Sequence, residues 1–461
     1  MLCPLLVSAQ STRISGQAPD YIGGQVLLYI EEDALSQKEI VVQSTEVDES
    51  GEFALDLDLT ETSPVRISID HVSGNMVVQP GVRYQVFFPP LQNEQVRSFS
   101  GTTTVDLVFI ELSPNDVNAV LSNLNYAVDS FMVANVALIG KPAFKNKLGE
   151  FEQALNNQYA TYDDPYIQTH KKYTLALTEF SSRAYSRLDL YERHLENIAL
   201  EPHLTFFDFL RTYFQRYFQQ FEANYGTDQV LPALKSENPG VALLELMEQD
   251  YLVRQDTLRE MVAIHGLMEI YHGEYPRDRV VDALDYIAKN GQTGFNKQAA
   301  RNAVQLLTAT EVGYEAPEIT LFNQYNEKVS LDQFQGKYVY LEFMSTWCTD
   351  CQREQTILPD LIADYGDVTE VVTVVVDSEA DAYQQYISSH PEYEWDILFD
   401  PSGYEVRNAY GVMALPTYFL INPEGMLVLS PASAPTDGIV ENLYPILQKA
   451  QEAQKLKVGE K

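Results

Sequence analysis

Two runs stand close together in the last third of the sequence, Tyr338-Val339-Tyr340-Leu341-Glu342-Phe343 and Trp347-Cys348-Thr349-Asp350-Cys351. The first run is rich in β-branched and aromatic residues, so it predicts a buried strand. From Asp350 to Ala363 a spacing of three and four recurs, which predicts a helix, with these positions on one face: Cys351, Glu354, Leu358, Leu361 and Ile362. We therefore expect a strand, a short turn that holds the thiols, and a helix.

The position of the two thiols predicts their chemistry. Cys348 falls at the N-terminus of the expected helix, where free amide donors and the helix dipole favour the thiolate, and the thiolate is the nucleophile. Cys351, one turn further along, can attack a mixed disulfide formed on Cys348. We expect Cys348 to be the exposed attacking thiol and Cys351 the resolving thiol.

The residues around the dithiol form an ordered set of motifs. They are Gly313-Tyr314-Glu315-Ala316-Pro317, Leu331-Asp332-Gln333-Phe334-Gln335-Gly336-Lys337, a strand from Val371 to Val376, Asp400-Pro401-Ser402-Gly403, Tyr410-Gly411-Val412, Leu415-Pro416-Thr417, a strand from Tyr418 to Ile421, Asn422-Pro423-Glu424-Gly425, and a strand from Met426. In this order the chain from Gly313 to Leu447 resembles the thioredoxin superfamily, and more narrowly the secreted TlpA/ResA-like thiol-disulfide oxidoreductases.

This resemblance implies a thioredoxin-like α/β domain over residues 313–450 and a set of site residues. Pro416 matches the position of a cis-proline opposite the dithiol, and such bonds usually mark a tight functional turn. Leu415 would offer its backbone to an extended substrate strand, with Thr417 beside it, and Trp347 would cover Cys348. The implied partners are protein thiols and disulfides and an upstream electron donor. We expect no cofactor other than the redox-active Cys348–Cys351 disulfide, and no metal.

Glu342 is an acidic residue in an otherwise apolar strand, six residues before Cys348. Thioredoxin carries a buried acid at the matching position, where many TlpA-like proteins carry an asparagine. A carboxyl buried there should have a raised pKa and could shuttle the proton of Cys351. The alternative is a glutamate that strand alternation turns to water.

The residues between the thiols bear on the direction of electron flow. Thr349 and Asp350 supply a negative charge and no positive partner, and anionic neighbours disfavour a thiolate. A less stabilised reduced form makes a dithiol a better reductant, so we expect a reductase or exchange role. The chain departs from many relatives in having Thr356 where they carry a proline, with Pro359 one turn later, which leaves the position of the helix kink open.

Composition limits the possible classes of protein. A chain of 461 residues is too long for one core, so we expect several domains. The net charge of −35 makes nucleic acid a poor partner, because the phosphates would be repelled. No run approaches the roughly 18 apolar residues of a membrane span.

The N-terminus resembles a secretory signal. Residues 1–9 form a short apolar segment that ends Val7-Ser8-Ala9, like a signal with its cleavage site, although it lacks a positive start. Cys3 as a lipid-attachment site is a weaker alternative. The other two of the three cysteines form the dithiol. We therefore expect an extracytoplasmic protein with no structural disulfide.

The first 310 residues contain two further regions. Residues 12–100 carry short strand-like runs separated by turns, which predict a β-sandwich: Val26 to Ile30, Glu39 to Gln43, Phe53 to Leu59, Val65 to Ile69, Met76 to Val78 and Tyr84 to Phe88. Residues 112–310 predict helices, the first beginning at Ser113-Pro114, and then Pro142 to Tyr159, Pro165 to Ser186, Leu204 to Phe221, Gly240 to Tyr271, Arg277 to Lys289 and Lys297 to Leu307.

One helix of the middle region carries a broad aromatic face, at Phe206, Phe207, Phe209, Leu210, Tyr213, Phe214, Tyr217, Phe218 and Phe221. Such a face usually packs in a core, but a peptide- or partner-binding groove is the alternative. His265 and His272 could share a helix face, but no third ligand stands at a recognisable spacing, so zinc is improbable there.

Two other functions compete with thiol-disulfide exchange. A thiol peroxidase would need a proline and a hydroxyl residue seven and three positions before the reactive cysteine. Ser345 fits the second position, but Leu341 occupies the first. A non-enzymatic binding protein with an accessory redox domain is the other alternative.

Overall fold

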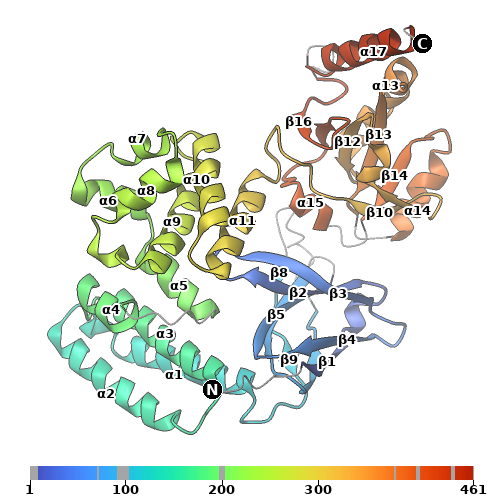
Figure 1. Cartoon of the computed structure of the whole chain (residues 1–461). Coiled ribbons are helices and arrows are strands. Elements are labelled where there is room, and N and C mark those ends of the chain that lie inside the picture. Colours follow the sequence, from blue (N-terminus) through green and yellow to red (C-terminus); the bar gives the residue numbers. More distant parts are fainter. Residues whose placement is uncertain are drawn as a thin grey trace.

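The computed structural model describes residues 9–69, 72–90, 103–196, 203–377, 380–400, 405–437 and 442–459 (Figure 1). As the sequence predicts, these residues form an N-terminal β region, a helical middle region and a C-terminal α/β region. Cys3, with nearly all of the predicted signal segment, lies outside the described residues, as do Pro401, Ser402 and Gly403. Within the described part, no helix has the length and hydropathy of a membrane span.

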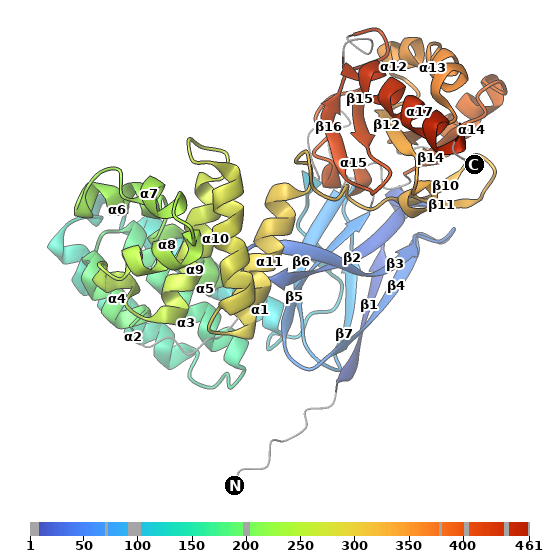
Figure 2. The ribbon, with the colours of Figure 1, turned by 45° about the horizontal axis from the view of Figure 1, so that its top comes forward.

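The N-terminal region is a sandwich of two sheets (Figure 2). One sheet has the order β4-β1-β7-β9 and consists of Glu52–Leu59, Gln10–Gln17, Arg83–Phe87 and Val108–Phe109. The other has the order β3-β2-β5-β6-β8 and consists of Lys38–Glu46, Gln25–Asp33, Ser63–Ile69, Val72–Val78 and Thr103–Thr104. Their inner faces share one apolar core, in which Ile14 and Leu55 of the first sheet join Leu28 and Ile67 of the second. The predicted β-sandwich is confirmed.

Strand β1 is absent from the strand-like runs of the sequence, because its residues include a single large apolar side chain, Ile14. It nevertheless occupies an inner position, antiparallel to β4 and parallel to β7. Gly16 leaves room for the ring of Phe53 on β4, since a Cβ on Gly16 would lie 1.9 Å from that ring. A strand that packs through a glycine leaves little apolar periodicity to detect.

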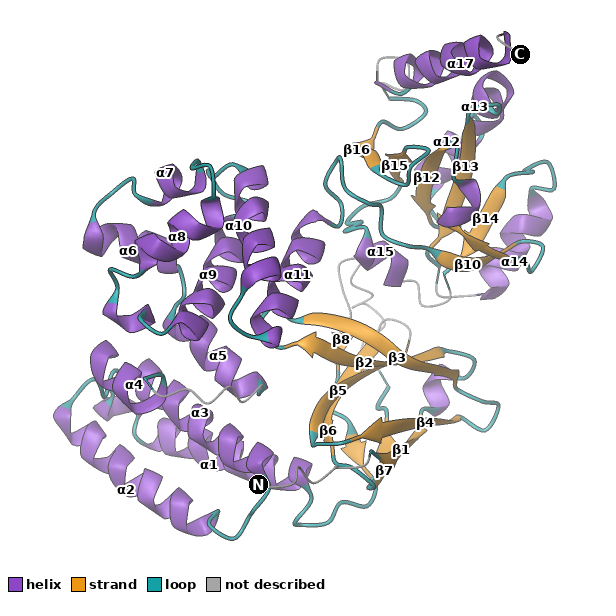
Figure 3. Ribbon diagram, in the orientation of Figure 1, coloured by secondary structure: helices purple, strands orange, loops and turns teal. Residues whose placement is uncertain are grey.

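Eleven α-helices lie between residues 117 and 308 of the described chain. They are α1 Val117–Ala134, α2 Pro142–Gln158, α3 Pro165–Ser181, α4 Arg187–His194, α5 Leu204–Tyr213, α6 Tyr217–Tyr225, α7 Val230–Leu234, α8 Pro239–Met247, α9 Asp256–Ile270, α10 Arg277–Asn290 and α11 Gly294–Thr308. In Figure 3 these purple helices gather beside the orange strands of the sandwich.

Three of the expected helices are wrong in extent. The expected helix from Leu204 to Phe221 breaks at Arg216, which has a left-handed φ of 55° and donates its backbone N–H to the Glu269 carboxylate of α9 at 2.9 Å. The expected helix from Gly240 to Tyr271 is interrupted around Asp250, whose carboxylate accepts the N–H of Leu252 at 3.0 Å. In both cases a side-chain carboxylate satisfies backbone donors and permits the break.

Helix starts also differ from the expected ones. The expected helix from Pro165 to Ser186 is the third with a wrong extent, because α3 ends at Ser181. Ser186 instead caps α4, in a reciprocal capping box with Asp189. Helix α1 begins after Asp116, which accepts the N–H of Asn118, so the predicted start at Ser113-Pro114 is three residues early. Ser113 and Pro114 belong to the turn before that cap.

The C-terminal region contains a mixed sheet of the order β11-β10-β14-β13-β12-β15-β16. Its strands are Lys328–Ser330, Thr320–Asn323, Asp396–Phe399, Thr369–Val375, Tyr338–Met344, Thr417–Ile421 and Leu427–Ala432. Its helices are α12 Thr349–Gln355, α13 Leu358–Tyr365, α14 Ala380–Ser389, α15 Glu405–Ala409 and α17 Tyr444–Gly459. This is the predicted thioredoxin-like α/β arrangement.

Strand β12 lies inside this sheet, parallel to β13 and antiparallel to β15. All its residues after Tyr338 are buried, because both faces of the sheet are covered. Tyr340 and Met344 pack on the side of α13, whereas Val339, Leu341 and Phe343 belong to the core on the other face. The even positions of β12, Glu342 included, therefore face the helices that follow the dithiol.

Helix α11 connects the three regions. Its Asn302 donates to Asp33 of β2 at 2.7 Å, and both side chains are buried. Directly after α11, Thr310 accepts a hydrogen bond from Ser430 of β16 at 2.6 Å. In Figures 1 and 2 the α/β region and helices α1–α10 lie apart, with α11 between them.

Candidate active site

The dithiol occupies the turn between β12 and α12. Cys348 is the N-cap residue of α12, and the N–H of Cys351 points at its Sγ at 3.1 Å. Cys348 and Cys351 form a disulfide. The predicted order of strand, thiol turn and helix is confirmed.

The helix after the dithiol is shorter than expected. The sequence predicts one helix from Asp350 to Ala363, but α12 ends at Gln355 and α13 begins at Leu358. Pro359 lies in the first turn of α13, where a missing N–H costs no hydrogen bond. The break between the two helices therefore falls at Thr356, and this is the position of the helix kink that the sequence left open.

Asp377 holds the turn that leads to the cysteines. It follows β13, is buried, and accepts hydrogen bonds from the hydroxyls of Ser345 and Thr346 and from the Thr346 N–H at 2.9 Å. The Cys348 N–H in turn donates to the Ser345 carbonyl at 3.0 Å. The conformation of the turn therefore depends on a carboxylate from the neighbouring strand.

The two cysteines differ in their exposure to solvent. Cys348 is 8% exposed and Cys351 is fully buried. The expectation of an exposed Cys348 is too strong for this oxidised state, but Cys348 is the one of the pair that solvent reaches. Trp347 is 68% exposed, so most of its indole lies in solvent.

The proline expected to be cis is cis. The Leu415–Pro416 bond is a cis peptide, and Leu415, Pro416 and Thr417 are all half-buried. Met413, which the sequence reasoning did not single out, is 67% exposed in the same loop. This loop leads into β15, which pairs with β12, the strand that precedes the dithiol.

Glu342 is fully buried, so the alternative that it faces water is wrong. Its carboxylate accepts hydrogen bonds from Gln355 and Thr373, both at 2.8 Å, and from Tyr418 at 3.0 Å. Burial raises the pKa of Glu342 to about 7, although these hydrogen bonds act in the opposite direction. Near neutral pH the group can therefore both accept and release a proton.

A second buried carboxyl, Glu354, lies one turn after Cys351 on α12. It accepts the N–H of Thr436 at 2.8 Å and the Thr436 hydroxyl, which ties α12 to the segment after β16. Its charge contributes to the raised pKa of Glu342. In the sequence, Glu354 served only as one of the positions that predict a helix. Its place on the same helix face as Cys351 could have identified it as a second acid of the site.

Asp350 has a positive partner, contrary to the expectation from sequence. Arg353 forms an ion pair with it at 3.1 Å, because residues three apart in a helix are neighbours. Both side chains are exposed, so solvent screens this pair strongly. The charge next to Cys348 is less negative than the sequence interpretation assumed.

The residues that contact Glu342 come from three separate segments, so sequence reasoning missed them. Gln355 belongs to α12, Thr373 to β13 and Tyr418 to β15. Strand register was the available signal, since both Thr373 and Tyr418 pair directly with Glu342. Polar residues at these positions of a central sheet predict a partner on the adjacent strand.

The aromatic face of the middle region is core, so the groove interpretation is wrong. All nine of its side chains, from Phe206 to Phe221, are buried in one cluster. Phe207 stacks on Phe295 of α11, and Phe218 occupies the space above Gly266 of α9. The break at Arg216 lets the two halves of the face turn toward different neighbours.

Comparisons with known proteins concern the α/β region. Residues 312–430 match the AhpC/TSA family. The thiol-disulfide oxidoreductase ResA of Bacillus thuringiensis subsp. konkukian is 30% identical over 119 residues, which are 26% of this chain and 68% of ResA. The thioredoxin-like protein YneN of Bacillus subtilis is 30% identical over 139 residues, 30% of this chain and 79% of YneN.

Solved structures give the same kind of match. A thiol-disulfide oxidoreductase from Bacteroides fragilis NCTC 9343 is 26% identical, with a TM-score of 0.23, and the match covers 25% of this chain and 87% of that one. Through the region that contains Cys348 and Cys351, the chain belongs to the ResA-related thiol-disulfide oxidoreductases.

Proposed function

We propose that this protein is an extracytoplasmic oxidoreductase that reduces or exchanges protein disulfides through Cys348 and Cys351. The observation that carries the proposal is the Cys348–Cys351 disulfide at the start of α12, in which Cys348 is the more exposed residue of the pair. The half-buried Leu415–Pro416–Thr417 loop supplies backbone groups for an extended substrate segment. Trp347 provides an exposed apolar surface beside the reacting sulfur.

The reaction starts from the reduced dithiol. The Cys348 thiolate attacks one sulfur of a substrate disulfide, that bond breaks, and the departing substrate sulfur takes up a proton. Cys351 then gives its proton to Glu342 and attacks the Cys348 sulfur. The bond between Cys348 and the substrate breaks, the second substrate sulfur leaves as a thiolate that takes up a proton from solvent, and Glu342 returns its proton to solvent. The substrate gains two electrons and two protons overall, and the protein keeps the Cys348–Cys351 disulfide. A dithiol protein of lower potential restores the reduced state.

The charge around the dithiol supports the reducing direction. Asp350, Glu354 and Asp377 bring three carboxyls to the turn and its helix, against the exposed guanidinium of Arg353. Negative charge disfavours the Cys348 thiolate and so favours oxidation of the dithiol. The expected midpoint potential is well below the roughly −120 mV of DsbA, and a value near −120 mV would contradict this direction.

The cysteine content supports an extracytoplasmic location. Outside the dithiol the sequence has one cysteine, Cys3, within an apolar N-terminal segment of the signal type. Once that segment is removed, no spare thiol is left to pair wrongly with the dithiol in an oxidising compartment. Alkylation of the protein in intact cells by a membrane-impermeant maleimide tests this location, and labelling only after lysis would contradict it.

Insulin reduction tests the proposed activity. Wild type with dithiothreitol should accelerate insulin precipitation, whereas Cys348→Ser should fall to the rate of dithiothreitol alone. Equal acceleration by both proteins would favour a binding protein with an accessory redox domain.

A thiol peroxidase is the second candidate, because the matching family carries the AhpC/TSA name. Leu341 stands in the position of the required proline and is a buried core residue. The Ser345 hydroxyl donates to Asp377 and is therefore already engaged. Consumption of hydrogen peroxide by the reduced protein, faster than its reduction of insulin, would favour this candidate.

A further inference from the structure

Gln355 is a fully buried amide between the active-site helix and Glu342. It is the last residue of α12 and lies four positions after Cys351, so both side chains are on the same helix face. Its Nε2 donates to Glu342 Oε2 at 2.8 Å, with Met344 Sδ at 3.0 Å and Thr373 Oγ1 at 3.4 Å as further neighbours. The amide nitrogen thus directly contacts the acid of the site.

The other end of the same amide is also fixed. Tyr386 of α14 donates its hydroxyl to Gln355 Oε1. In the reversed orientation, Oε1 would face the Glu342 carboxylate, and two oxygens without a proton between them repel. Tyr386 and Glu342 together therefore hold the amide with its N–H groups toward the carboxyl.

The two oxygens of Glu342 differ in what their partners can do. Oε2 accepts from Gln355 and Thr373, whereas Tyr418, at 3.0 Å, is the one described residue from which Oε1 accepts a hydrogen bond. An amide N–H can only donate, whereas the hydroxyls of Tyr418 and Thr373 can donate or accept. The Thr373 oxygen already accepts the indole N–H of Trp395 at 3.0 Å, which leaves the Thr373 hydroxyl as a donor to Oε2. If Oε2 took up a proton, that proton would face the N–H of Gln355.

We propose that Gln355 is a positioning residue that keeps Oε2 of Glu342 as an acceptor, so that the carboxyl gains and loses its proton at Oε1, against Tyr418. The inference rests on the proposed function, in which Glu342 takes the proton of Cys351. When Oε1 carries the proton, the Tyr418 hydroxyl turns from donor to acceptor. Gln355 thereby stabilises the ionised form, while Tyr418 contacts both forms.

Other groups also act on Glu342. They are Glu354 of α12, Tyr340 of β12, Tyr418 of β15, Tyr386 of α14, and Tyr393, which follows α14. Burial raises the pKa of Tyr340, Tyr386, Tyr393 and Tyr418, so these tyrosines stay neutral over the pH range in which Glu342 titrates. Glu354 accepts the Thr436 N–H at 2.8 Å, so we expect its position to be unchanged in a Gln355 variant.

The test is a carbon-13 NMR titration of the Glu342 carboxyl in the reduced full chain, assigned by its loss in Glu342→Gln. Gln355→Met keeps the volume but removes the donor, so the Glu342 midpoint should rise by about one to two pH units. Tyr418→Phe should raise the midpoint less, because it removes a partner of both forms. The pH at which insulin reduction reaches half its maximum should move up with the Gln355→Met midpoint.

An unchanged midpoint in folded Gln355→Met overturns the inference, and so does a Tyr418→Phe shift equal to or larger than that of Gln355→Met. If Gln355→Met does not fold, Tyr386→Phe decides, because it frees the amide to rotate and should also raise the midpoint. No rise in Tyr386→Phe then overturns the inference. Insulin reduction by wild type at pH 9 separates this outcome from failure of the proposed function, since wild type should be active there whether or not Gln355 sets the Glu342 midpoint.

Discussion

Glu342 is a carboxyl without solvent contact, and its burial makes stability depend on pH. Its pKa is about 7 in the folded chain against an ordinary value of 4.5. Between these two values the folded state holds a proton that the unfolded state has released. Stability therefore falls as the pH rises from about 4.5 to about 7, and the loss is complete above that range.

Glu342→Gln should remove this dependence. Between pH 5 and pH 8, wild type should lose about 3 kcal/mol more unfolding free energy than the variant, measured by urea denaturation. Glu31 and Glu152 also have pKa values raised to about 7 by burial, but both are present in the two proteins and cancel in the difference. Identical pH dependence of the two proteins would contradict the assignment.

Asp377 offers a second test at a single residue. Asp377→Ala leaves the Thr346 N–H and the hydroxyls of Ser345 and Thr346 without their acceptor, at a cost of about 1–3 kcal/mol. Asp377→Asn retains one acceptor oxygen and should lose about half as much. Urea denaturation measures both, and equal stability of wild type and Asp377→Ala would show that the turn does not depend on this carboxylate.

Sequence located the reacting residues but only part of their surroundings. Cys348, Cys351, Pro416 and Glu342 stand in one run or at recognisable motif positions. Gln355, Thr373 and Tyr418 come together only when the strands pair, so no local pattern reports them. The Asp350–Arg353 pair could have been predicted, because its spacing is a helical one.

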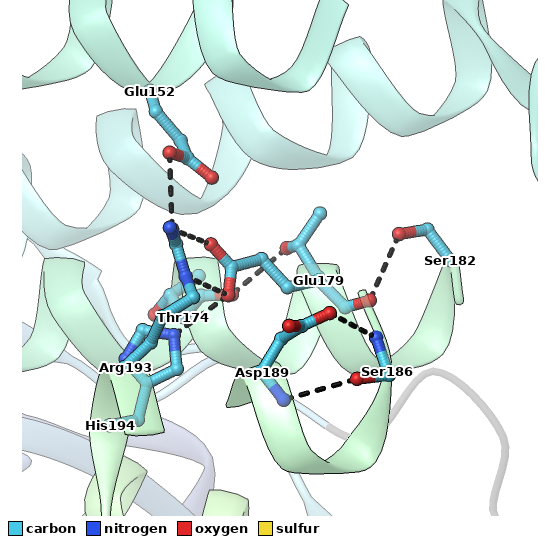
Figure 4. Close-up of polar contacts among 9 residues, drawn as sticks. Glu152, Thr174, Glu179, Ser182, Ser186, Asp189, Arg193 and His194 are labelled. Atoms are coloured by element: carbon cyan, nitrogen blue, oxygen red, sulfur yellow. Dashed lines mark hydrogen bonds and ion pairs between the residues drawn. The ribbon is translucent and has the colours of Figure 1, made fainter. Parts of the chain in front are cut away.

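Among the elements, helices α2, α3 and α4 meet around a buried carboxylate. Figure 4 shows Arg193 between the carboxyls of Glu152 and Glu179, with His194 on Glu179 at 2.7 Å. Glu179 is almost fully buried, so its charge requires these partners. Charged contacts therefore join these three helices in addition to their apolar contacts.

Arg193→Met should therefore loosen this junction. It removes the guanidinium from the buried Glu179 carboxylate, which keeps its contact with His194, and should cost about 2 kcal/mol, less than for a fully buried pair because Arg193 is partly exposed. Arg183→Met, at an exposed arginine after α3, is the matched control and should change stability by less than about 0.5 kcal/mol. Thermal unfolding compares them, and equal losses would contradict a special role for Arg193.

Most expected strands and helices exist, whereas several of their ends were wrong. Apolar periodicity continues across Arg216 and Asp250, but the helices stop there because Glu269 and Asp250 satisfy backbone donors. The Glu269 contact comes from a distant part of the sequence, and the Asp250 contact comes from a polar side chain, so the spacing of apolar residues reveals neither of them. Periodicity predicts which face is buried better than where an element ends.

For the whole molecule, the net charge of −35 should influence which substrates arrive fastest. A disulfide peptide with several lysines should be reduced severalfold faster at low salt than the same peptide with glutamates, because opposite charges speed encounter. The difference should shrink as ionic strength rises. Stopped-flow fluorescence measures both rates, and equal rates at low salt would show that net charge does not steer substrates here.

The organisation into three regions follows from patterns that change along the chain, from alternating strands to helices to strand–helix units. The placement of the three regions relative to one another cannot be predicted from these patterns. It depends on contacts between positions far apart in sequence, such as Asn302 with Asp33 and Ser430 with Thr310.

The central claim is that Cys348 forms a transient covalent bond with substrate, and trapping measures it most directly. Reduced Cys351→Ser protein, mixed with a disulfide peptide and digested, should give one mixed disulfide on Cys348 by mass spectrometry, and dithiothreitol should release it. The absence of an adduct, or an equal yield from Cys348→Ser through Cys351, would contradict the account.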